Sequence, residues 1–77
     1  MGGYWQYRSS RGTFRIAPRD GGFAAYYENE DLGWYQSAQA ALDDLAAGHT
    51  FFPSNGLDPS SCGLPEDISE WEYLIRP

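Results

Sequence analysis

Carboxylates are the side chains of this 77-residue chain with the greatest scope for chemistry, since eleven residues are acidic. Two carboxylates that face each other across a cleft can divide the acid and base roles of glycoside hydrolysis. Asp43 and Asp44 are neighbours in the sequence, as are Glu66 and Asp67, but adjacent helical residues point in different directions and do not share a site. The acidic run at residues 28–31 lacks the alternating aspartates of an EF-hand loop. These carboxylates therefore predict neither hydrolysis nor calcium binding.

The other reactive side chains stand alone. His49 is the only histidine, and no second nitrogen or thiolate ligand stands at a spacing typical of a metal site. Cys62 is the only cysteine, so the chain cannot form an internal disulfide, and no nucleophile signature surrounds it. No serine lies in a Gly-x-Ser-x-Gly turn, and no glycine-rich loop leads into a helix. The sequence therefore predicts a protein that is not an enzyme and that holds no cofactor or metal.

The N-terminal part of the chain predicts an antiparallel sheet. Apolar and polar residues alternate over about residues 4–9, 12–17 and 23–28, which is typical of half-buried strands. Short turns join these strands into a meander, and residues 33–35 could add a fourth strand. Pro18 is expected to end the second strand, because proline has no N–H for the ladder.

A helix is expected over about residues 37–47. Ser37 is a favourable N-cap, Leu42 and Leu45 share an apolar face, and Gly48 is typical of the residue after a helix. Residues 48–77 predict an irregular segment, within which residues 65–75 suit either a helix or a turn followed by a strand. The predicted fold is a single α+β domain, in which one α-helix covers a three- to four-stranded antiparallel β-meander.

Charge is distributed unevenly along the chain. The net charge is −6, all five basic residues are arginine, and four of them precede residue 20. From Asp20 to Ile75 the chain carries eleven acidic residues and no basic one. Asp43 and Asp44 stand in the second half of the predicted helix, where negative charge opposes the helix dipole. Helix stability does not explain them, which leaves a binding role or solubility as the reason for the acidity.

The functional hypothesis is that carboxylates present a negative surface to a protein with a basic, nucleic-acid-binding groove, in place of DNA phosphates. Direct binding of nucleic acid by this chain is not expected, since that requires a basic stripe. The residues predicted to bind the partner come from the acidic loop, the helix and the C-terminal segment: Glu28, Glu30, Asp31, Asp43, Asp44, Glu66, Asp67, Glu70 and Glu72.

In size, acidity and predicted architecture, the chain resembles the small phage-encoded anti-CRISPR proteins. The resemblance rests on these nine carboxylates and on the length of the chain, without a shared motif. Several proteins of that group use acidic residues to block the DNA-binding surfaces of CRISPR complexes. The resemblance implies an inhibitor that mimics DNA in the cytoplasm of a host cell.

A second hypothesis is a small accessory or homodimerising domain that binds through exposed aromatic residues. The candidates are Trp34, Tyr35, Phe51, Phe52 and Trp71. Monomer and homodimer both stay open. No apolar run has the length of a signal peptide or a membrane span, and a single cysteine fits a reducing compartment. We therefore expect a cytoplasmic protein that does not contact membranes.

Overall fold

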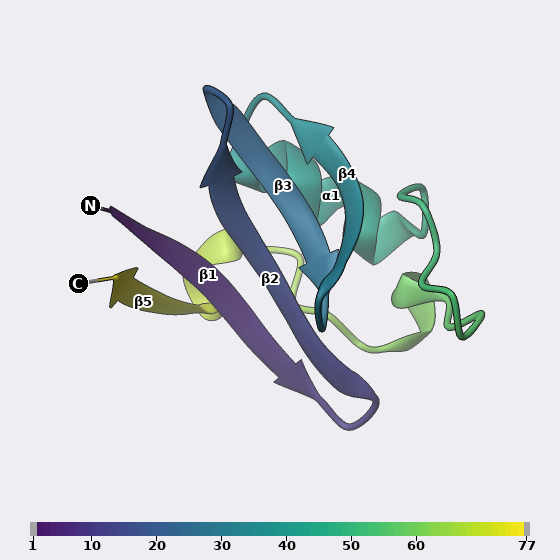
Figure 1. Cartoon of the computed structure of the whole chain (residues 1–77). Helices are drawn as coiled ribbons and strands as arrows, with labels where there is room; N and C mark the ends of the chain where they lie inside the picture. Colours follow the sequence, from purple (N-terminus) through teal and green to yellow (C-terminus); the bar gives the residue numbers. More distant parts are fainter. Residues whose placement is uncertain (1, 77) are drawn as a thin grey trace.

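Five strands and one α-helix account for most of residues 2–76, the part of the chain that the computed structural model describes (Figure 1). The strands are β1 (Gly2–Ser9), β2 (Gly12–Arg19), β3 (Gly22–Tyr27), β4 (Glu30–Tyr35) and β5 (Glu72–Arg76). They form one antiparallel sheet in the order β4-β3-β2-β1-β5, and α1 (Ala38–Ala47) packs against one face. The predicted α+β fold is confirmed, with one strand more than the three or four expected.

The capping residues of α1 act as their types predict. The Ser37 hydroxyl accepts a hydrogen bond from the N–H of Ala40 at 3.0 Å, which satisfies one of the free donors of the first turn. Gly48 ends the helix in the left-handed conformation, with a φ of 77°, and its N–H bonds the carbonyls of Asp44 and Leu45. This helix is too short to cross a membrane, and no helix among the described residues is long and apolar enough to do so.

The core lies between α1 and the near face of β2, β3 and β4. Phe14 and Ile16 of β2 pack there with Leu42 and Leu45 of α1, and all four residues are fully buried. Burying each such side chain contributes roughly 1.5–3 kcal/mol. These contacts hold α1 on the sheet, and so fix the position of every charge on the outer surface of the helix.

The C-terminal segment is more ordered than the irregular chain that was expected. It contains two short 3-10 helices, η1 (Pro59–Ser61) and η2 (Ile68–Glu70), and then β5, which pairs antiparallel with β1. Residues 65–75, for which the sequence suits either a helix or a turn followed by a strand, are therefore a turn followed by a strand. Gly3 permits the pairing, because a Cβ at that position would collide with the carbonyl O of Leu74 and with the ring of Tyr73.

Pro18 does not end β2, contrary to the expectation from its missing N–H. It lies inside the strand, opposite Phe23 of β3. The reason is that the ladder between β1 and β2 stops at the pair Trp5 and Ile16. Beyond that pair β1 bends away toward β5, as Figure 1 shows, so Pro18 has no β1 neighbour that would need its N–H.

Candidate functional site

The nine predicted carboxylates do not form one surface. Three of them, at the β3–β4 turn and in β4, are engaged within the molecule. Glu28 accepts from the N–H of Thr13 at 2.7 Å, and Glu30 accepts from the N–H of Ser54 at 3.0 Å. Asp31 forms an ion pair with Arg19 and accepts from the N–H of Gly33 at 2.9 Å. These three carboxylates hold turns and loops in place.

The ion pair of Arg19 and Asp31 also changes their proton affinities. The hydrogen bond from the Arg19 guanidinium is the main cause that lowers the pKa of Asp31, and the N–H of Gly33 adds to it. The same contact raises the pKa of Arg19. Asp31 is therefore more firmly ionised than an ordinary aspartate, but its charge is matched by an arginine and does not face a partner alone.

Four other carboxylates lie on α1 and on the segment before β5, and two of them, Asp43 and Glu66, line the same hollow. We call this group the acidic surface: Asp43, Glu66, Asp67 and Glu70. All four side chains are exposed. Gln39 joins the two parts, since its side-chain N–H groups donate to the Asp43 carboxylate and to the carbonyl O of Glu66, each at 2.9 Å. Its side-chain oxygen also accepts from the N–H of Ile68 at 3.2 Å.

Two members of the acidic surface have internal roles, and two do not. Asp67 caps η2 by accepting from the N–H and hydroxyl of Ser69, and these hydrogen bonds lower its pKa. Among the residues that the structure describes, Gln39 alone donates a hydrogen bond to the Asp43 carboxylate. Within the described residues, the carboxylates of Glu66 and Glu70 have no hydrogen bond or ion pair. Their charges are therefore available to an external cation.

Asp44 and Glu72 lie outside the acidic surface. Asp44 is half-buried beside Tyr35, and burial of the phenol, with the Asp44 charge and hydrogen bond as further causes, raises the pKa of Tyr35 to about 12. Glu72 begins β5 opposite Gln6, whose side chain bonds Arg15 on the uncovered face of the sheet. The structure thus separates these two residues from the predicted group.

The shape of the acidic surface suits a flat contact. A hollow lined by Asp43, Ala46, Ala47 and Glu66 has a volume of about 130 Å³. Pockets that enclose small molecules usually measure about 300–1,000 Å³. This hollow is therefore smaller than the usual small-molecule pocket.

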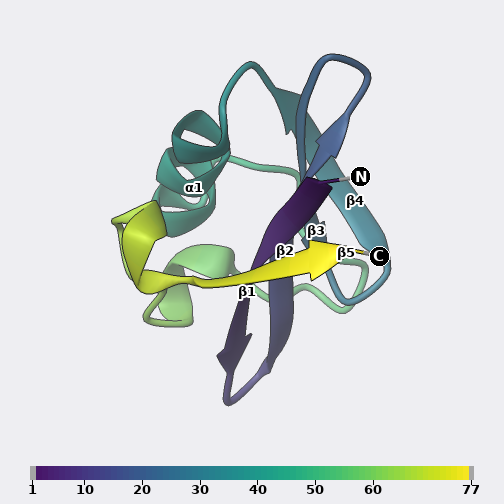
Figure 2. The same ribbon diagram turned by 90° about the vertical axis from the view of Figure 1, so that its left-hand side faces the viewer.

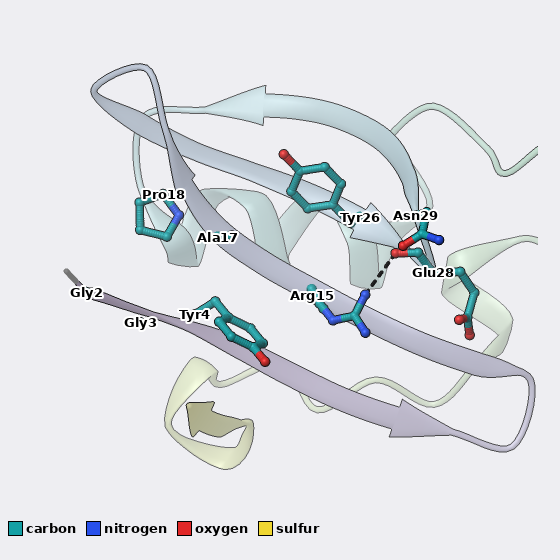
Figure 3. A pocket seen from close by; sticks show the side chains of 9 residues that line it. All are labelled: Gly2, Gly3, Tyr4, Arg15, Ala17, Pro18, Tyr26, Glu28 and Asn29. Atoms are coloured by element: carbon teal, nitrogen blue, oxygen red, sulfur yellow. Dashed lines mark hydrogen bonds between the residues drawn. The ribbon is translucent and has the colours of Figure 1, made fainter. Parts of the chain in front are cut away.

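A larger cavity of about 430 Å³ opens on the uncovered face of the sheet, where β1 and β2 separate (Figure 3). Tyr4, Arg15 and Tyr26 project into it. The Arg15 guanidinium donates to the side-chain oxygen of Gln6 at 3.2 Å and to the carbonyl O of Glu28 at 3.0 Å. Alternation along the strands predicts that Arg8 and Arg15 share this face, but the cavity depends on the divergence of two strands, which has no local sequence signal.

The aromatic residues predicted to bind a partner differ in how exposed they are. Trp34, Phe51 and Phe52 are exposed, with Phe51 the most open at 76%. Tyr35 is half-buried against the core. The prediction that Trp71 is exposed is wrong: it is 4% exposed, and its indole N–H donates to the carbonyl O of Pro65 at 3.1 Å. A buried tryptophan of this kind anchors the C-terminal segment, which is why it cannot serve as a docking residue.

No protein-family model matches the chain, and no curated protein or solved structure does either. In the part of the chain that the structure describes, no group of three or more His, Cys, Asp or Glu side chains is placed to hold a metal ion. The geometry of the surfaces is therefore the basis for a functional conclusion.

Proposed function

We propose that this protein binds, without catalysis, a partner with a basic nucleic-acid-binding groove, and that the acidic surface is the contact. Its carboxylates would take the positions that DNA phosphates occupy in that groove, so that the protein inhibits the partner by mimicry. Attraction between such surfaces is strong at low salt and is screened as salt rises.

The observation that carries the proposal is the group of exposed carboxylates that form no ion pair among the described residues. Residues 20–75 contain no lysine or arginine, so α1 and the segment that Gln39 ties to it carry unbalanced negative charge. Asp43 lies in the second half of α1, where the helix dipole disfavours an acid. A position that works against helix stability is better explained by binding than by folding.

The test uses two variants with the same change in net charge. Asp43→Asn with Glu70→Gln neutralises the acidic surface, while Asp20→Asn with Glu28→Gln neutralises two turn residues on the sheet. In the control, Asn tolerates the positive φ of Asp20, and Gln keeps an acceptor for the N–H of Thr13. The probe is a fluorescent arginine-rich peptide of the kind that binds nucleic acid, with a short DNA duplex as its competitor.

We expect the wild-type protein to displace the duplex from the peptide, and its affinity to fall steeply between about 50 mM and 200 mM salt. The acidic-surface variant should bind about tenfold more weakly at low salt, because two exposed ion pairs are lost. The control should stay within about twofold of wild type. Equal weakening of both variants would show that only the net charge matters, and would refute the proposal.

A further inference from the structure

The two outer strands of the sheet, β4 and β5, differ in how the rest of the chain covers them. Along β4, the N–H of Phe51 donates to the carbonyl O of Leu32 at 3.1 Å, and Ser54 is bonded to the Glu30 carboxylate. The loop after α1 therefore occupies the outer side of β4. No segment of residues 2–76 pairs with the outer side of β5. Figure 2, which looks toward that side, shows β5 nearest the viewer.

The centre of β5 carries no charge or proline that would protect an outer strand. Natural outer strands carry central charges, prolines or bulges, because a row of free backbone groups would otherwise pair with another chain. The central residues of β5 are instead Tyr73, Leu74 and Ile75. Tyr73 is 48% exposed and Ile75 is 72% exposed. An exposed apolar outer strand is a template for a further strand.

We propose that the occupant of this edge is β5 of a second copy of the chain, paired antiparallel about a two-fold axis. The sequence of β5 is complementary to its own reverse: Glu72-Tyr73-Leu74-Ile75-Arg76. With the axis at Leu74, the acidic residue 72 of each copy stands opposite the basic residue 76 of the other. Tyr73 then stands opposite Ile75. Each pair occurs twice, as a two-fold interface requires.

Charge and polarity select this register over its neighbours. A shift by one residue would place every side chain on the opposite face of the sheet. A shift by two residues would put apolar Leu74 opposite a charged residue and would leave at least one charge without its counterpart. Only the register centred on Leu74 pairs both charged residues, and directly opposite charges stabilise antiparallel strands.

The face toward α1 gives a second reason for this pairing. The rings of Tyr73 and Trp5 contact each other there at a centroid distance of 4.8 Å, while α1 lies over β2, β3 and β4. A second copy of β5 would extend this apolar row with its own Ile75 and Tyr73. The dimer would run as a continuous ten-stranded sheet. It goes beyond the proposed function, since β5 contains no residue of the acidic surface.

The register can be tested with introduced cysteines, in a Cys62→Ser background that removes the natural thiol. Leu74→Cys places the two new thiols opposite each other at the axis, where antiparallel Cα atoms are about 4.5–5.5 Å apart. Mild oxidation should give a covalent dimer on a non-reducing gel. Tyr73→Cys places its thiols diagonally, beyond the roughly 7 Å limit for a disulfide, and should give little covalent dimer. Equal cross-linking of both variants would overturn this register.

A charge exchange tests the same pairing without a covalent bond. In sedimentation equilibrium, the wild-type chain should populate a dimer. Glu72→Arg or Arg76→Glu alone should weaken dimerisation about tenfold or more, because like charges then face each other twice. Combining both substitutions should restore the wild-type dissociation constant. Circular dichroism confirms that each variant is folded.

Two outcomes of the charge exchange would overturn the proposal. The first is a wild-type chain that stays monomeric at every concentration measured. The second is a dimer that is unaffected by the single substitutions, which would place the interface elsewhere. If a single variant failed to fold, the cysteine pair and the double exchange would still decide the question.

Discussion

On the face of the sheet that α1 covers, Phe14 and Ile16 of β2 are fully buried, whereas Arg15 and Arg19 of the same strand remain partly exposed on the other face. Both faces come from one strand, because successive side chains alternate. The hydrophobic core lies on the covered face. The uncovered face holds the arginines, two aromatic rings and the cavity of Figure 3.

Positive and negative charges lie on different sides of the molecule. Arginine charge on the uncovered face is partly matched within the molecule, since Arg19 pairs with Asp31. On the other side of the molecule, the carboxylates of Glu66 and Glu70 have no partner within the described residues. A net charge of −6 is therefore not spread evenly, and two of the unmatched carboxylates lie on the segment that Gln39 ties to α1. Stability and binding can therefore be tested separately, with substitutions on different sides of the molecule.

The largest expected difference between the two faces is in stability. Phe14→Ala should lower the free energy of unfolding by about 3–5 kcal/mol, because it leaves a cavity under α1. Tyr26→Ala, on the uncovered face, should cost about 1 kcal/mol, as a half-exposed residue has fewer contacts to lose. Urea unfolding measures both values. Equal costs would mean that the uncovered face is buried in solution by another chain.

A smaller effect is expected at the N-terminus of α1, the helix that covers the sheet. Ser37→Ala should lower the free energy of unfolding by about 1 kcal/mol, because the N–H of Ala40 loses its acceptor. Ser37→Asp restores an acceptor and should recover most of this loss. Thermal unfolding of the three proteins checks the order. If Ser37→Ala were neutral, the first turn of α1 would not depend on its cap.

Local patterns predicted much of this fold, since alternation and capping act between residues that are close in sequence. The strands of the meander and the cap residues Ser37 and Gly48 follow from such patterns. The pairing of β5 with β1 joins the two ends of the chain and has no local signal. Pro18 was misjudged because its tolerance depends on where β1 leaves β2.

The candidate site was harder to predict than the fold. Sequence indicates which residues are charged, but not which charges are matched by a distant partner. Glu30 is bonded to Ser54, and Asp31 to Arg19, through contacts that only the folded chain creates. Gln39 is an ordinary polar helix residue in the sequence, yet it joins the two parts of the acidic surface. Side-chain bonds across the fold decided which carboxylates remained free.

On the side of α1, the burial of the Tyr35 phenol, together with its contact with Asp44, predicts a loss of stability at high pH. The folded-state pKa of Tyr35 is about 12, above its ordinary value of 10.0, so the folded chain holds this proton more tightly. The stability that results is present below pH 10 and is lost as pH rises toward 12. Asp44→Asn should lower the pKa of Tyr35, although burial keeps it above the ordinary value. Phenolate absorbance measures the pKa of Tyr35, with Tyr35→Phe as the reference. If the pKa of Tyr35 were the same in Asp44→Asn as in the wild type, the Asp44 carboxylate would be excluded as a cause.

On the uncovered face, the smallest effect is expected at low pH. The pKa of Asp31 is lowered, mainly by the hydrogen bond from Arg19, so this carboxylate stabilises the folded chain above the unfolded pKa. That contribution is lost as pH falls through the lower folded-state pKa. Arg19→Gln should move the pKa of Asp31 up toward its ordinary value, which carboxyl NMR titration measures directly. Because the N–H of Gly33 still bonds Asp31, part of the lowering should persist. If the pKa of Asp31 did not change, solvent would screen the ion pair of Arg19 and Asp31 too well for it to stabilise the fold. The two faces of the sheet would then differ only in how deeply their side chains are buried.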